Sequence, residues 1–196
     1  MERGVRRRGR RGFTLMEILV VIIIIAVLAA VAGPMISSMT DKGRKSATKS
    51  QMKNIKSAII ALSSDIGIYP GRSTVVYTDT NGNILAADDS NNVLASPTYI
   101  KSERRKLWKG PYMDGSAQDF MMDGWGETIC IIVDNWALAT KMWLASKGAD
   151  GDWTELNGKV TQKGTTNLYT TSDPNSIDAI VGNDDADDIV ISVYRF

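Results

Sequence analysis

The chain has 196 residues, 43% of them hydrophobic, and carries 23 basic and 22 acidic side chains for a formal net charge of +1. Its single cysteine, Cys130, excludes an intrachain disulfide. It contains no histidine, which excludes Ser-His-Asp and Cys-His catalysis and a histidine-ligated metal. Any catalysis would have to use carboxylates, lysine or a metal bound by oxygen atoms.

The N-terminus has the pattern of a membrane segment. The first twelve residues hold six arginines and one glutamate, and residues 18–33 are wholly apolar. A helix from Phe13 to Met35 would reach roughly 34 Å, enough to cross a bilayer's hydrocarbon core, with the basic flank on the cytoplasmic side. An ordinary secretory signal cut near Ala30–Ala32 would instead release a soluble enzyme. Glu17 argues against that alternative, because a carboxylate in the apolar segment costs at least a few kcal/mol.

The junction between the two parts reads Gly12-Phe13-Thr14-Leu15-Met16-Glu17. It resembles the class III leader of type IV pilins and type II secretion pseudopilins, in which a basic leader ends in Gly before Phe-Thr-Leu, a variable residue, Glu and an apolar run. The resemblance implies that a prepilin peptidase cleaves between Gly12 and Phe13 and methylates the Phe13 amine. Pro34 stands where many family members carry a helix-disrupting proline, so we expect Phe13, Glu17 and Pro34 to serve assembly.

Without residues 1–12 the chain keeps 17 basic and 21 acidic side chains, a net charge of −4, so no nucleic-acid partner is expected. The helical pattern resumes after Pro34 with a 3, 4, 3, 4 spacing of apolar residues, and Gly67 and Pro70 end it. We predict a transmembrane and assembly part at 13–39 and an amphipathic part at 40–66. Basic residues on the second part favour anionic lipid headgroups or DNA, or a solvated or intersubunit helix face. The apolar stripe is Met52, Ile55, Ile59, Leu62 and Ile66, and the basic residues are Lys42, Arg44, Lys45, Lys49, Lys53 and Lys56.

Residues 67–196 are expected to form one small globular domain with an insertion at about 152–183, which is polar and weakly patterned. The predicted fold class is α+β, a long N-terminal helix packed on a small antiparallel sheet, as in type IV pilins. The predicted elements are a hairpin turning at Asn81-Gly82, a short helix at Pro97–Leu107, an antiparallel hairpin of Thr128–Val133 and Ala139–Ala145, and a last strand at Ile189–Tyr194.

Three short motifs strengthen the resemblance to the major pseudopilin. Gly67-Ile68-Tyr69-Pro70 resembles its Gly-x-Tyr-Pro, and Trp108-Lys109-Gly110-Pro111-Tyr112 resembles its Trp-x-Gly-Pro-Tyr. Asp123-Gly124-Trp125-Gly126 resembles Asp-Pro-Trp-Gly, with Gly124 in place of the proline. By residue type alone, the aromatic side chains favour either a carbohydrate platform or packing in the core and turns.

Clustered aspartates are the one further constellation with possible chemistry. If the loop at Asp150 meets the run at 184–188, the carboxylates need a cation, protonation or solvent. Ca²⁺ prefers such oxygen ligands, and a solvated acidic loop is the alternative. The major pseudopilin binds Ca²⁺ between a Ser-x-Gly-x-Asp-Gly motif and an acidic stretch. That resemblance implies ligands at Asp150, Asp185, Asp187 and Asp188, with a backbone carbonyl near Lys147.

The resemblance to the major pseudopilin implies a non-enzymatic subunit of a periplasmic type II secretion pseudopilus. Its expected location is the inner membrane, single-pass, with the C-terminal domain in the periplasm. The expected partners are further copies in a helical filament, minor pseudopilins, the prepilin peptidase, the inner-membrane assembly platform and membrane lipid. The alternative is a type IV pilin or minor pilin of a surface fibre for adhesion, motility or DNA uptake.

Overall fold

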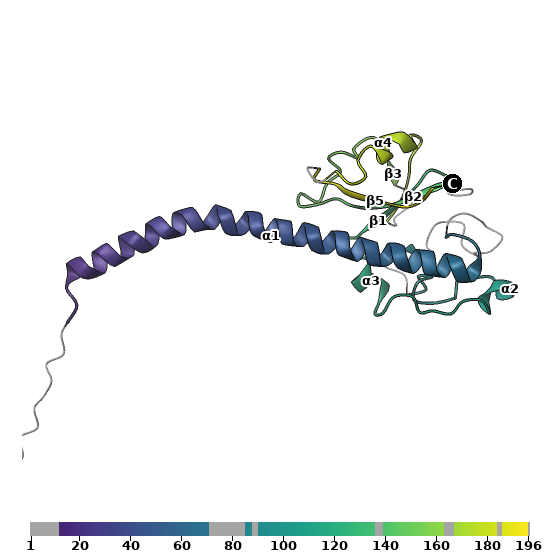
Figure 1. Cartoon of the computed structure of the whole chain (residues 1–196), viewed down its shortest axis with the longest axis horizontal. Coiled ribbons are helices and arrows are strands. Elements are labelled where there is room, and N and C mark those ends of the chain that lie inside the picture. Colours follow the sequence, from purple (N-terminus) through teal and green to yellow (C-terminus); the bar gives the residue numbers. More distant parts are fainter. Residues whose placement is uncertain are drawn as a thin grey trace, which may run out of the picture. The chain divides into compact units, whose positions relative to one another are not determined.

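The computed structural model describes residues 12–70, 85–87, 90–135, 139–162, 167–183 and 186–195. The predicted hairpin turning at Asn81-Gly82 lies outside these residues. The chain divides into two units, residues 1–41 and residues 42–196. The long helix α1 runs through both, and the described residues of the second unit also form a sheet and three short helices (Figure 1).

Helix α1 runs from Leu15 to Ile66 over 52 residues, which confirms the predicted long helix, and it continues through Gly33 and Pro34. Gly67 follows its last residue, with a φ of 83° that glycine adopts without a steric penalty. The large apolar side chains of residues 18–31 are exposed, as a membrane segment requires. In the second unit the predicted apolar stripe is fully buried, with Met52, Ile55, Ile59, Leu62 and Ile66 all at 0% exposure.

The sheet has five strands in the order β3-β4-β1-β2-β5. The predicted hairpin is present, since β1 and β2 pair antiparallel with Cys130 opposite Ala145. The predicted last strand pairs antiparallel with β2. The α+β prediction is confirmed, but the sheet is mixed rather than antiparallel. The strands are β1 (Cys130–Val133), β2 (Lys141–Ser146), β3 (Thr161–Gln162), β4 (Leu168–Thr170) and β5 (Ile189–Arg195).

The mixed character comes from the predicted insertion at 152–183, which contains β3, β4 and helix α4 (Pro174–Asp178). Strand β4 runs parallel to β1, with Ile131 opposite Leu168. A parallel neighbour requires a long crossover connection, and the chain between β2 and β4 supplies it. The insertion therefore completes the sheet.

Two apolar cores lie on opposite faces of this sheet. The first joins the α1 stripe to one set of strand residues, including Ile131 and Met142. The second joins the alternate strand residues, including Ile132 and Trp143, to the insertion. Both faces being covered explains why all four residues of β1 are buried. The insertion contributes Leu156, Ile177 and Ile180 to the second core, with Trp153, Val160 and Val181 packed against it.

Two more short helices lie in the loop between α1 and β1. In Figure 1 they lie on the opposite side of α1 from the strands: α2 (Ser102–Arg105) and α3 (Ala117–Phe120). The predicted helix at Pro97–Leu107 is therefore reduced to four residues. The Ser96 hydroxyl accepts a bond from the Thr98 amide at 3.4 Å, and such local side-chain bonds compete with helix formation.

Candidate assembly helix and acidic-loop site

The predicted cleavage residues and the predicted assembly residue Glu17 lie at the start of α1, whereas Pro34 lies farther along it. Gly12 and Phe13 precede the helix, and the Phe13 side chain is 78% exposed. Glu17 lies in the first turn, where the helix dipole favours a negative charge. Its amide donates to the Thr14 hydroxyl at 3.2 Å, so Thr14 caps the helix. The Thr-x-x-Glu spacing of a capping box was the signal for this role of Thr14, which the motif alone does not assign.

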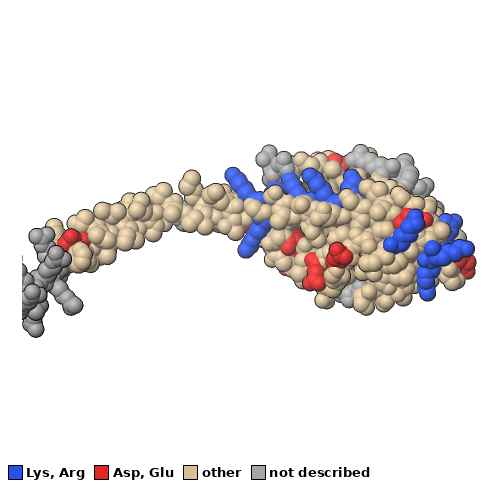
Figure 2. All heavy atoms as spheres, turned by 60° about the horizontal axis from the view of Figure 1, so that its bottom comes forward, with Lys and Arg blue, Asp and Glu red and all other residues tan. Residues whose placement is uncertain are grey.

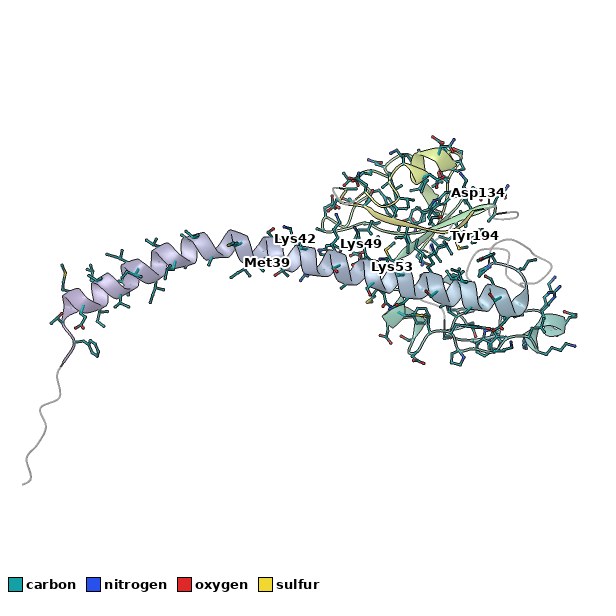
Figure 3. All side chains as sticks on the ribbon, in the orientation of Figure 1. Met39, Lys42, Lys49, Lys53, Asp134 and Tyr194 are labelled. Atoms are coloured by element: carbon teal, nitrogen blue, oxygen red, sulfur yellow. The ribbon has the colours of Figure 1, made fainter. Side chains whose placement is uncertain are left out.

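Within the part of the chain that the structure describes, α1 is the one helix long and apolar enough to span a membrane. Its polar continuation is tied to the globular domain by side chains that reach backbone carbonyls. Lys45 Nζ donates to Ala186 O at 2.6 Å, and Lys56 Nζ donates to Ser192 O at 2.8 Å. Two of the predicted basic residues, Lys45 and Lys56, thus bind backbone carbonyls of the domain. Lys42, Lys49 and Lys53 follow one another along α1 (Figure 3).

The Trp-Lys-Gly-Pro-Tyr motif packs at the C-terminal end of α1. Trp108 Nε1 donates to Val93 O at 3.1 Å, and the Tyr112 hydroxyl donates to Asp65 Oδ2 at 2.9 Å. The two rings meet edge to face, with centroids 5.7 Å apart. Both side chains are half-buried against the first core, which favours packing over a carbohydrate platform. Lys109 adds an ion pair to Asp65 at 2.8 Å.

The Asp-x-Trp-Gly turn docks directly on the α1 backbone. A Cβ atom at Gly124 would lie 2.6 Å from Arg44 O, so any side chain there would push the turn away. The Gly124 amide donates to the Thr48 hydroxyl at 2.8 Å, a bond that proline cannot make. Glycine in place of the proline of the major-pseudopilin motif therefore goes together with a close, hydrogen-bonded contact to the helix.

The same turn reaches the acidic loop through a buried serine. Asp123 Oδ1 accepts from the amides of Trp125 and Glu127, each at 2.9 Å, and its Oδ2 accepts from the Ser146 hydroxyl at 2.6 Å. Ser146 ends β2, and its hydroxyl accepts from the Gly148 amide at 3.2 Å. Asp123 thus fixes the point at which the chain enters the predicted metal loop.

The two predicted acidic loops meet. The carboxyls of Asp150 and Asp187 lie close enough for each to shift the pKa of the other. Burial and the contact with Asp150 raise the pKa of Asp187, whereas bonds from the Asp152 amide and the Thr154 hydroxyl lower that of Asp150. Gly148 has a φ of 74°, and a Cβ there would collide with Asp187 O, which makes glycine necessary.

Asp188 is the most buried carboxyl of the loop, at 0% exposure. Its Oδ2 accepts from the amides of Glu155 and Leu156, each at 2.8 Å. Burial raises the pKa of Asp188 to about 6, because water no longer solvates its charge. Glu155 accepts in return from the amides of Asp187 and Asp188, at 3.1 and 2.9 Å. Sequence reasoning missed Glu155, since nothing in the insertion's spacing marks it.

Two carboxylate oxygens in this cluster lack a hydrogen-bond donor among the described residues. Asp187 Oδ2 and Asp188 Oδ1 are buried and have no hydrogen-bond partner among the described residues. Such oxygens are hard ligands of the kind Ca²⁺ takes. Within the described ranges no three His, Cys, Asp or Glu side chains form a metal-ligand group, and Asp184 and Asp185 lie outside those ranges. The Lys147 ammonium lies 5.7 Å from the Trp153 ring centroid.

Comparison with known proteins gives one match. Residues 7–33 match the family model described as the prokaryotic N-terminal methylation motif, which spans the basic flank, Gly12-Phe13, Glu17 and the apolar run. Neither the curated proteins nor the solved structures contain a match to this chain.

Proposed function

We propose that this chain is a structural subunit of a type II secretion pseudopilus. The N-terminal methylation motif at residues 7–33 supports a type IV pilin-like or pseudopilin subunit. The observation that carries the proposal is that motif at the start of a helix apolar enough to span a membrane. The function needs no catalysis: cleavage at Gly12 frees the Phe13 amine, and copies pack their α1 helices into a periplasmic filament. Minor pseudopilins, the prepilin peptidase, the assembly platform and membrane lipid are the partners of this proposal.

Glu17 has a specific role in it. Cleavage creates a positive amine at Phe13, and Thr14 to Met16 offer no charge to neutralise it. We expect Glu17 of one copy to pair with the Phe13 amine of the next as it enters the filament. In a low dielectric such a pair is strong, and either partner alone is penalised.

The features that favour the pseudopilus over a type IV pilin lie in the globular domain. Trp108, Tyr112 and the Gly124 turn hold the domain on α1 at the positions of the major-pseudopilin motifs. A single cysteine rules out the C-terminal disulfide loop that many type IV pilins carry. A pilin of a surface fibre is the second candidate, and the N-terminal motif serves it equally.

The test is Glu17→Val in the full chain, with Ile18→Val as the matched control. Removing one partner of a buried ion pair costs about 3 kcal/mol, so assembly should fall about a hundredfold. Intact mass should still show an N-terminus at methylated Phe13, and the domain should remain folded. Secretion and crosslinking between α1 helices are measured in parallel. Normal filaments and secretion from Glu17→Val would refute the role of Glu17. If deletion of the chain left secretion normal but removed a surface fibre, the chain would be a type IV pilin.

We also propose that the acidic loop holds Ca²⁺ through Asp187 and Asp188, with Asp150 beside them. Two buried carboxylate oxygens without donors and two carboxyls in contact support this. The ion would neutralise the loop and join the insertion to β5. Asp185 and a carbonyl near Lys147 remain candidate ligands from the family resemblance.

Calcium should therefore stabilise the fragment lacking residues 1–36. At a concentration of 100 times Kd it should add about 2.7 kcal/mol, which for a domain of this size is about 5–10 °C in Tm. Asp150→Ala should remove that response, whereas Asp152→Ala should keep it. A Tm that is the same in calcium and in chelator would leave a solvated acidic loop.

A further inference from the structure

A groove of about 440 Å³ lies between α1 and the segment that carries α3. Two amide side chains of α1 form one wall, and two carboxylates with two aromatic side chains form the other. None of its lining residues, as far as the structure describes them, is a lysine or arginine. The lining includes Gln51, Asn54, Tyr112, Asp114, Asp119 and Phe120.

The polar atoms of this groove are mainly acceptors. Asp114 is exposed and makes no hydrogen bond or ion pair with any residue that the structure describes. Asp119 Oδ2 accepts from the Ser116 hydroxyl at 2.6 Å, and this bond lowers the pKa of Asp119, which keeps it charged. Gln51 Nε2 donates to Phe120 O at 2.8 Å, which leaves its own carbonyl oxygen as an acceptor. Such a surface suits a partner that brings cationic donors.

The segment around α2 has the complementary charge. Between residues 101 and 109 it carries five basic side chains and one acidic one. Arg104 donates to Ile66 O at 2.9 Å, which anchors the segment to the C-terminal end of α1. Lys106 is exposed, and its side chain has no partner among the described residues. Figure 2 shows a basic group at the α2 end and an acidic group over the α3 region on one face of the second unit.

We propose that the groove receives the α2 segment of a second copy of this chain, with Lys106 of one copy beside Asp114 of the other. This deepens the proposed filament function by naming a contact between its globular domains. The two patches differ, so the contact is heterologous, and such contacts continue from copy to copy. Asn54 in the groove and Ile66 at the α2 anchor are twelve residues apart on α1. Parallel copies would therefore be displaced by about 18 Å along the helix.

Paired cysteines in the full chain in membranes test this contact. Asn54→Cys and Leu107→Cys place thiols on the two patches, since both side chains are exposed. Mild oxidation should give a ladder of linked copies. Asn54→Cys with Thr161→Cys is the control, because exposed Thr161 lies in β3, away from both patches. Cys130 is buried and contributes no link in the chain without added cysteines.

Charge reversal gives the sharper test. Asp114→Lys or Lys106→Glu should each lower the yield of the 54–107 link about fivefold, by replacing attraction with repulsion. The double variant should restore it. A yield that neither single variant changes, or that the double variant fails to restore, refutes the contact. Products that link only to other proteins also refute it.

A disulfide between the Leu19→Cys residues of two copies tests separately whether the apolar segments pack together in a filament. Copies that link at residue 19 but not between 54 and 107 would keep the pseudopilus proposal and refute this contact. Absence of both links would refute the two together.

Discussion

The clearest prediction concerns Leu156, which tests whether the insertion is part of the domain's cooperative core. Leu156 is fully buried in the second core, beside strand residues that include Trp143. Its backbone amide donates to Asp188, and that bond survives replacement of the side chain. Leu156→Ala therefore removes packing alone, at a cost of about 3–5 kcal/mol. For a domain of this size that is about 6–20 °C in Tm.

The measurement is the thermal unfolding of the fragment lacking residues 1–36, followed by near-UV and far-UV circular dichroism. We expect one transition, shifted as a whole, because both cores share the same strands. Ile60→Ala is the control, since Ile60 is 38% exposed and its truncation should cost less than about 0.5 kcal/mol. An unchanged main transition with an early separate loss of signal would show that the insertion folds independently, and would refute the reasoning.

Two further predictions concern the contacts that hold the domain on α1. Thr48→Val leaves the Gly124 amide without its acceptor and should lower the free energy of unfolding in urea by about 1–3 kcal/mol. Ser57→Ala, on the exposed face of α1, should have little effect. Equal effects of the two variants would contradict the role of Thr48 in holding the Gly124 turn on α1. The hydrogen bond from Lys109 holds the pKa of Asp65 below its ordinary 3.8, so this pair stabilises the fold above pH 3.8 and the stabilisation is lost as the pH falls through the lowered pKa. The Tm of the unchanged chain should exceed that of Asp65→Asn at pH 5–7, and this difference should vanish with acidification. A Tm difference that is constant with pH would exclude the ion pair as its source.

The parts of the fold with regular periodicity could be predicted from the sequence. The apolar stripe of α1 follows the 3.6-residue period, and burial of Ile55 and Ile59 follows from it. The hairpin of β1 and β2 was equally visible, because both strands are apolar runs joined by a polar turn. In these elements the local pattern and the tertiary contacts agree.

The insertion could not be predicted in this way. Strands β3 and β4 have two and three residues, too few for an alternating pattern. The pairing of β4 with β1 depends on Ile131 meeting Leu168, a contact between residues far apart in the chain. The apolar residues of the insertion, such as Leu156 and Ile177, are scattered among polar ones, so their common core was not evident.

The acidic site was predictable in part. Asp150 and Asp187 meet, as the resemblance to the major pseudopilin implied, although the insertion separates them in sequence. The participation of Glu155 depends on how the insertion folds back on the 187–188 backbone. The sequence showed only that Gly124 replaces the proline of the major-pseudopilin motif. The reason, its close approach to Arg44, is seen only in the structure.

The two edge strands of the sheet affect whether separate chains can aggregate through their backbones. An open edge strand offers unpaired backbone groups to other chains. At one end β3 has only two residues, both exposed and polar, which is too short a template for pairing. At the other end Lys56 of α1 occupies the carbonyl of Ser192 in β5. The two-residue β3 and the bond from Lys56 to β5 thus leave less of the sheet's edges open to pairing with other chains.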